Sequence, residues 1–208
     1  MQSNYDKQAQ NARALFVTYD QREMIEKHGL EHDDDYLYLT FIGDRYRISR
    51  ETGEIFREAG EWETCGDYNV VMTLYDVLCF PQTTPRLSHE WCALRGLQAT
   101  INSPNPDIFS RKYANAFAGH GDRLWRACRK LGGQQAEIAA GADVYCQFDV
   151  FPFFPVQFRF WDADDEFPAA IQLLWDKNSL AFMHFETLYY VMLPLLDKLL
   201  ALFREERP

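Results

Sequence analysis

The chain has 208 residues, of which 47% are hydrophobic and 15% aromatic, so it can bury a sizeable core and does not have the composition of a disordered chain. Acidic residues outnumber basic residues by 31 to 21, and the net charge of −10 repels phosphate backbones, which argues against nucleic-acid binding. The five cysteines include no CxxC pair, and no apolar signal segment begins the chain, so we expect a cytoplasmic protein with reduced, mostly buried thiols.

Two short helices are expected at the start of the chain. Apolar residues at helical spacing predict a helix from Asn4 to about Tyr19. Asp20 can cap a second helix, which should end at Gly29 because glycine readily adopts the left-handed conformation that closes a helix. The acidic segment at 32–35 is expected to be a solvated loop.

An antiparallel meander is expected next. Alternating apolar residues predict three strands, at 36–42, 45–49 and 54–57. Gly43 and Gly53 can make the tight turns between these strands, because both turns favour positive φ. After a polar connection through Trp62, Asp67 can cap a helix near 68–79.

The middle of the chain predicts less regular structure. Residues 81–108 are rich in Pro, Ser, Thr and Asn, which indicates a long loop with short ordered pieces. A helix is expected from Phe109 to about Leu131, with a break near Gly119 and Gly121 and an end at Gly132.

The C-terminal part has the densest apolar pattern. Alternation predicts three more strands, at 143–150, 155–161 and 171–175. The segment from Ser179 to Phe203 is apolar almost all the way round, so it predicts a helix that lies under this sheet. Polar residues such as Asp197 and Lys198 interrupt the helix, and we therefore do not expect it to span a membrane.

These elements predict an α+β fold in which antiparallel β-meanders pack on helices. We expect one domain over residues 1–208. Because an apolar helix follows each meander, the chain has either a pseudo-duplicated β-β-β-α unit or a chance likeness between two apolar helices. In the first case the sub-halves are 1–80 and 141–208, joined by a loop and helical region at 81–140.

His184 and Glu186 form the first candidate site. Glu186 falls on one helical stripe with Phe182 and Tyr189, so we expect it to face the core, where a carboxylate must be paired or hydrogen-bonded. Residues two apart on a helix point in different directions, so the two side chains cannot form a local metal pair. They are either structural polar groups or acid–base or ligand-holding groups, which in an enzyme would act with Asp76 or with the His89–Glu90 pair.

His89, Glu90 and Trp91 form the second candidate site, in a loop that also contains Cys92. His-x-x-Cys is half of a metal site, but the sequence has no matching pair elsewhere, so a closed zinc site is not expected. The three residues are candidates for ligand binding, as is Trp175 in the last predicted strand. The alternatives are a thiol nucleophile at Cys92 or a loop whose tryptophan simply fills the core.

Acidic residues crowd the predicted turn between the last two strands. Asp162, Asp164 and Asp165 are candidate ligands for a hard cation such as calcium. The spacing and the central glycine of an EF-hand are missing, and the alternative is a solvated hairpin tip.

The sequence contains no phosphate-binding glycine loop, GxSxG, HExxH or dinucleotide-binding fingerprint. Several stretches nevertheless resemble those of a known family, the domain of unknown function 3786. These are YLYLTFIGDRYRIS, VMTLYDVLC, LSHEWCALRGL, FPFFPVQFRFWDADDEFPAAIQLLWDKN and MHFETLYYVM. The resemblance covers nearly the whole chain, and the run from Phe151 to Tyr190 is its most specific part.

The resemblance implies a protein of anaerobic bacteria or archaea. Some members of that family carry an additional N-terminal iron–sulfur domain, of the kind found in corrinoid proteins of one-carbon metabolism. The resemblance does not extend to that domain or to its cysteines, so we do not expect a bound cluster. It brings no activity, cofactor or catalytic residue with it.

Three functions are compatible with these observations. The first is an accessory protein that binds a small molecule or a protein partner in an aromatic cleft, with the 81–108 loop as its lip. The second is a small enzyme that uses Glu186 or His184 as an acid–base group. The third is a homo-oligomeric scaffold that buries its C-terminal helix between subunits.

Overall fold

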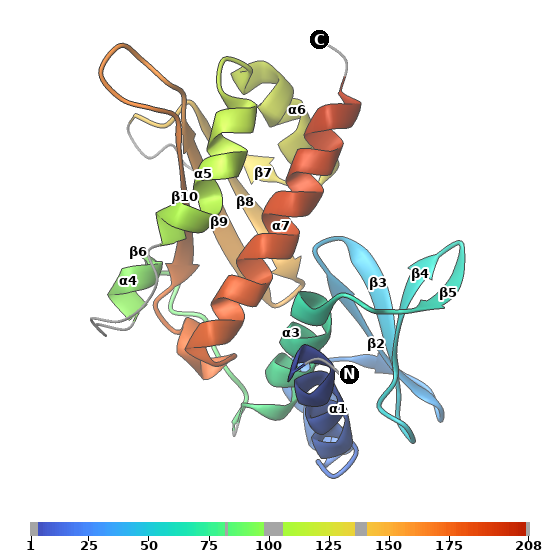
Figure 1. Cartoon of the computed structure of the whole chain (residues 1–208). Coiled ribbons are helices and arrows are strands. Elements are labelled where there is room, and N and C mark those ends of the chain that lie inside the picture. The colour runs from blue at the N-terminus through green and yellow to red at the C-terminus, as the bar shows by residue number, and fades with distance from the viewer. Residues whose placement is uncertain (1–3, 82, 98–105, 136–140, 207–208) are drawn as a thin grey trace. The chain divides into compact units, whose positions relative to one another are not determined.

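The computed structural model describes residues 4–81, 83–97, 106–135 and 141–206. Within these ranges it has seven α-helices and two antiparallel five-stranded sheets, which confirms the α+β class and shows that the two meanders form separate sheets. The chain divides into two compact units, the first made of residues 1–86 and 180–191 and the second of residues 87–179 and 192–208 (Figure 1). The proposed single domain, its sub-halves and the internal duplication stay predictions.

The first unit contains a sheet with the strand order β1-β2-β3-β4-β5. Its elements are α1 (Asn4–Phe16), α2 (Gln21–His28), β1 (Glu31–His32), β2 (Tyr36–Phe41), β3 (Asp44–Ser49), β4 (Ile55–Ala59), β5 (Glu61–Thr64) and α3 (Tyr68–Cys79). The three predicted strands are confirmed as β2, β3 and β4. The prediction of a polar connection through Trp62 is wrong. Gly60 adopts a φ of 83° and turns the chain, so that Trp62 in β5 pairs with Glu58 in β4.

The caps predicted in the first unit are confirmed. Asp20 accepts hydrogen bonds from the N–H groups of Arg22 and Glu23 at the start of α2, and Gly29 ends this helix in the left-handed conformation. Asp67 caps α3 in the same way. Local sequence therefore determines the ends of both helices.

The core of the first unit lies between one face of its sheet and the helices. Leu37, Leu39 and Phe41 alternate with more exposed residues along β2 and are buried. Helices α1 and α3 lie side by side (Figure 1), and the rings of Phe16 and Tyr75 on these helices are 5.8 Å apart. The Tyr75 hydroxyl donates a 2.6 Å hydrogen bond to the carbonyl of the Gly53 turn, which ties the meander to α3.

His28, the last residue of α2, is expected to make the first unit sensitive to acid. Burial lowers the pKa of His28 from its ordinary 6.5 to about 4. In the unfolded chain His28 binds a proton below about pH 6.5, whereas in the folded chain it does so only below about pH 4. The free energy of unfolding is therefore highest above pH 6.5 and falls as the pH drops from 6.5 to 4. We expect the free energy of unfolding of the wild type to fall by about 2–3 kcal/mol over this range, and we expect no such fall in His28→Gln.

Urea unfolding of both proteins across this pH range measures the difference. Parallel curves for the wild type and His28→Gln would show that His28 titrates normally in the folded state.

The second unit contains a sheet with the strand order β6-β10-β9-β8-β7. Its elements are β6 (Trp91–Ala93), α4 (Leu94–Leu97), α5 (Pro106–Phe117), α6 (Gly121–Lys130), β7 (Gln134–Gln135), β8 (Val144–Phe151), β9 (Phe154–Trp161) and β10 (Ala170–Asp176). The three predicted strands are confirmed as β8, β9 and β10. The predicted helix, broken at Gly119 and closed at Gly132, is confirmed as α5 and α6.

The segment at 81–108, which was predicted to be a long loop with short ordered pieces, contains two such pieces. Trp91, Cys92 and Ala93 form an edge strand that pairs with β10, and α4 follows directly. Residues 82 and 98–105 of this segment lie outside the described residues.

Aromatic residues build the core of the second unit. Phe117 in α5 contacts Phe160 in β9, with ring centroids 6.3 Å apart, and Phe203 in the C-terminal helix, with centroids 4.9 Å apart. Figure 1 shows α5 lying along β10, against which it packs. The apolar pattern of the C-terminal strands thus forms a core with α5 and the end of the chain.

The C-terminal helix, α7 (Phe185–Glu205), starts later than predicted. Ser179–Ala181 form a 3₁₀ turn, and the N–H of His184 donates to the side chain of Asp76 instead of to the carbonyl four residues earlier. Glu186 is exposed in the first turn of α7, so its predicted position on the core face is wrong. No helix in the part of the chain that the structure describes has the length and apolar character needed to cross a membrane.

Candidate functional site

A groove of about 430 Å³ lies in the first unit, between α1, α3 and the first turns of α7. We call it the dyad groove. It brings together the three residues that the sequence suggested as catalytic, namely Asp76, His184 and Glu186. Its other lining residues are Gln8, Asn11, Ala12, Leu15, Tyr68, Met72, Thr187 and Tyr190.

Asp76, near the end of α3, organises one side of this groove. Its carboxylate accepts hydrogen bonds from the backbone N–H of His184 at 2.8 Å, from Nδ1 of the same residue at 2.6 Å and from the Thr187 hydroxyl at 2.5 Å. The side chain is only 16% exposed. Asp76 thus caps the start of α7 from another helix and orients the His184 ring.

The contact with Asp76 determines which nitrogen of His184 carries the proton. An ionised carboxylate can only accept hydrogen bonds, so Nδ1 must be the donor, and in the neutral ring Nε2 then carries a lone pair. The ring packs on Phe80, with centroids 4.0 Å apart, and the side chain is 59% exposed. Nε2 can therefore act as an acceptor, base or ligand at the groove.

Glu186 supplies a second negative group to the groove. It lies two residues after His184 in the first turn of α7, where a carboxylate interacts favourably with the helix dipole. Within the described residues its side chain takes part in no ion pair or hydrogen bond. It remains available to a donor group of a ligand.

Two tyrosines, Tyr68 of α3 and Tyr190 of α7, also line the dyad groove. The Tyr68 hydroxyl donates a 2.5 Å hydrogen bond to the side-chain oxygen of Gln8. Burial and, to a smaller extent, the interaction with the Tyr190 hydroxyl raise the pKa of Tyr68 to about 12, so this hydroxyl stays protonated at neutral pH. The rings of Tyr68 and Tyr190 meet edge to face, 5.6 Å apart.

Sequence reasoning missed this tyrosine wall. Asp67 marked the start of α3 and so placed Tyr68 in its first turn, but nothing local indicates that α1 and α7 would lie beside that turn. Gln8 is 60 residues from its partner Tyr68. Only the tertiary fold brings these side chains together.

The second set of candidates lies in the second unit, around the buried Asp176. This carboxylate accepts hydrogen bonds of 2.7–2.9 Å from the N–H groups of Ser88, His89 and Asn178 and from the Ser88 hydroxyl. His89 adopts an unusual φ of 58°, and its side chain is exposed. Glu90 is also exposed and forms an ion pair with Lys177 at 2.5 Å.

The aromatic candidates of this set occupy two strands. Trp91 is half-buried in β6, whereas Trp175 in β10 is 1% exposed. Of the four candidates, Trp175 lines a cavity, which is described below, while His89 and Glu90 face solvent.

The third set of candidates lies on the turn between β9 and β10. The Asp164 carboxylate accepts hydrogen bonds from the N–H groups of Glu166 and Phe167, as in an Asx turn, and Asp165 is exposed. Asp162 accepts a hydrogen bond from the N–H of Gly119. In the ranges that the structure describes, no three His, Cys, Asp or Glu residues are grouped so as to hold a metal ion.

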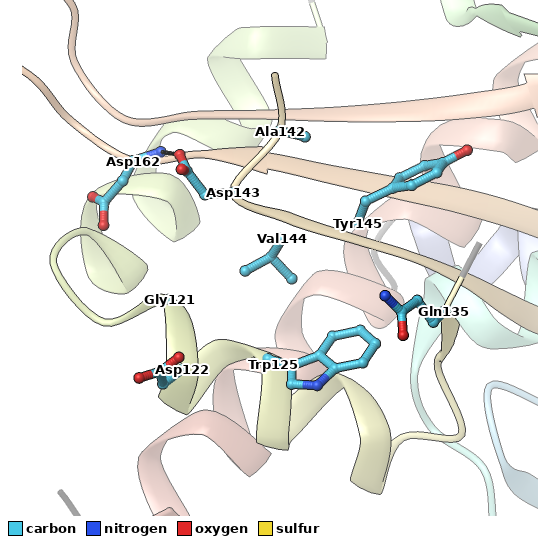
Figure 2. Close-up of a pocket in the computed structure, with 9 residues that line it drawn as sticks. All are labelled: Gly121, Asp122, Trp125, Gln135, Ala142, Asp143, Val144, Tyr145 and Asp162. Atoms are coloured by element: carbon cyan, nitrogen blue, oxygen red, sulfur yellow. Dashed lines mark hydrogen bonds between the residues drawn. The ribbon is translucent and has the colours of Figure 1, made fainter. Parts of the chain in front are cut away.

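Asp162 also lines a cavity of about 550 Å³ in the second unit. Figure 2 shows Asp143 and Asp162 together on one side of this cavity, with Trp125 of α6 and Gln135 of β7 on the other. The dashed line in Figure 2 is the 2.7 Å hydrogen bond from the Asp162 N–H to the Asp143 carboxylate. These carboxylates thus hold the ends of β8 and β9 in place.

Comparison with known families identifies the chain. The family model described as Domain of unknown function (DUF3786) matches residues 20–195. The chain belongs to the DUF3786 family. Comparisons with curated proteins and with solved structures gave no match.

The matched range of this DUF3786 protein contains Asp76, His184 and Glu186, whereas α1, which supplies one wall of the dyad groove, precedes it. The description of the family states no activity.

Proposed function

We propose that the dyad groove binds a small molecule and that the protein works as a small-molecule-binding accessory protein. The observation that carries this proposal is the 2.6 Å contact between Asp76 and Nδ1 of His184 at a groove of about 430 Å³. This volume falls within the usual size of ligand sites. A partly buried carboxylate that orients an exposed histidine is the arrangement expected for a group that must meet a ligand in one orientation.

The chemistry of the groove indicates what the ligand carries. Nε2 of His184 and the carboxylate of Glu186 are both acceptors, so the ligand should present hydroxyl or amino groups to them. Leu15, which is 52% exposed, Met72 and Tyr190 offer apolar surface for the rest of the molecule. A compact polyol or amine with an apolar or planar part fits both requirements.

An acid–base enzyme is the second candidate. The geometry of Asp76 and His184 favours it, because a carboxylate on Nδ1 also stabilises the imidazolium that forms when Nε2 takes a proton. In this case His184 removes a proton from a hydroxyl group of the bound molecule. Glu186 is then the group that orients the substrate.

Native mass spectrometry after incubation with the small-molecule fraction of a cell extract tests the proposal. The wild type should carry an added mass, and His184→Gln should lower its occupancy about tenfold, because a hydrogen bond in a polar site contributes on the order of 1–2 kcal/mol. His120→Gln, which changes an exposed histidine of the second unit, is the matched control and should bind like the wild type.

Equal occupancy in the wild type and His184→Gln, or no added mass on the wild type, would contradict this function. An added mass that changes with time in the wild type but not in His184→Gln would favour the enzyme.

A further inference from the structure

A second, smaller cavity lies beside β10 in the second unit. Its volume is about 170 Å³, and six of the nine residues that line it are apolar. Ile171, Leu173 and Trp175 line it from β10, Leu94 from α4 and Met192 from α7. These residues are at most 8% exposed, so this part of the cavity wall belongs to the apolar core of the unit.

Three polar residues line this cavity, namely Arg95, Ser110 and Gln172 of β10. Ser110 of α5 is 6% exposed, and Arg95 of α4 is an exposed residue that also lines the cavity. Across the ranges that the structure describes, no acidic side chain forms an ion pair with Arg95. The cavity therefore combines apolar side chains of the core with polar ones, and among the described residues the Arg95 guanidinium has no ion-pair partner.

The size of the cavity limits what it can hold. An engineered cavity of about 150 Å³ lined by Leu, Ile and Phe in another protein stays dry and binds benzene. A cavity of about 170 Å³ accordingly holds one six-membered ring or a short branched chain, and no large cofactor. A guanidinium matches the planar geometry of a carboxylate, to which it can donate two parallel hydrogen bonds.

We propose that this cavity binds a small apolar monocarboxylate. The ring or branched chain lies against Leu173 and Trp175, and the carboxylate binds Arg95 at the edge. Water gains little beside the apolar side chains, whereas the apolar part of such a ligand fills the space between them. The carboxylate of the ligand then lies beside the Arg95 guanidinium. The site lies in a different unit from the dyad groove and does not rest on the function proposed for it.

A titration with benzoate tests this inference. Calorimetry measures the affinity, and methyl NMR of Ile171, Leu173 and Met192 locates the bound molecule. Wild-type protein should bind benzoate with a Kd of about 1 mM or below, which is realistic for a ligand of this size. Binding should shift the three methyl signals together. Arg95→Gln should weaken binding roughly tenfold, because it removes a charge-assisted pair.

Two controls make the result specific. Arg129→Gln changes an exposed arginine of the same unit that does not line the cavity, and it should bind benzoate like the wild type. Benzyl alcohol, which has the ring without the charge, should bind the wild type and Arg95→Gln equally. Absence of saturable benzoate binding at millimolar concentrations would overturn the inference, and so would equal affinity in Arg95→Gln.

Discussion

Replacing Asp176 with alanine is expected to lower the free energy of unfolding of the second unit by about 3–5 kcal/mol. The Asp176 side chain is fully buried, and it accepts three backbone N–H groups and one hydroxyl. Burial by itself raises the pKa of Asp176, but hydrogen bonds from Ser88, Asn178 and His89 outweigh burial and hold the pKa below its ordinary value. Alanine leaves these donors without an acceptor.

The same substitution should release the strained backbone at His89. Its φ of 58° costs free energy for a residue other than glycine, and the hydrogen bond from its N–H to Asp176 holds it in place. Urea unfolding measures the stability, and hydrogen exchange should show that the His89 amide loses its protection.

Asp165→Ala, a change of an exposed carboxylate on the β9–β10 turn, is the matched control and should stay within about 0.5 kcal/mol of the wild type. A loss below about 1 kcal/mol in Asp176→Ala would mean that the loop holds its shape without this carboxylate.

Replacing Asp76 with alanine should destabilise the first unit by about 2–3 kcal/mol and should also abolish ligand binding in the dyad groove. The carboxylate accepts three hydrogen bonds at the start of α7, and without it the N–H of His184 and the Thr187 hydroxyl lose their partner. The His184 ring then becomes free to rotate, so Nε2 no longer has a fixed position. Thermal and urea unfolding measure the first effect, and native mass spectrometry measures the second.

Glu186→Ala is the control for stability, because this carboxylate is in the same turn of α7 but is exposed. It should change the free energy of unfolding by less than about 0.5 kcal/mol. Wild-type stability in Asp76→Ala would show that α7 begins at Phe185 for reasons other than this cap.

Elements defined by neighbouring residues could be predicted from the sequence. Asp20 and Gly29 delimit α2 because a side-chain acceptor and a left-handed residue satisfy the ends of a helix locally. The long strands β2, β8, β9 and β10 follow from alternation, since their apolar residues must all point to one face. The α+β class follows from these elements.

Features that depend on distant residues could not be predicted. The short edge strands β1 and β7 have two residues each, which is too few for alternation to be visible. The start of α7 is determined by Asp76, which lies 108 residues before His184. The predicted burial of Glu186 was wrong because it assumed that Phe182 and Glu186 lie on one helix. Phe182 precedes α7, which starts at Phe185.

The candidate site was predictable in part. Polar residues in an apolar segment drew attention to His184 and Glu186, and the structure places Asp76 beside His184. The wall formed by Gln8, Tyr68 and Tyr190 left no local signal. The arginine beside the small cavity left none either, because Arg95 looks like any solvated residue until Trp175 and Met192 are placed next to it.

Asp76 holds His184 with Nδ1 protonated, so that Nε2 can accept a hydrogen bond at the dyad groove. Long-range proton–nitrogen NMR of the His184 ring at about pH 9, where an ordinary histidine is neutral, reads the tautomer directly. Wild-type protein should show a protonated Nδ1 and an unprotonated Nε2, and Asp76→Ala should lose this preference. A neutral ring protonated at Nε2 in the wild type would contradict this role of Asp76.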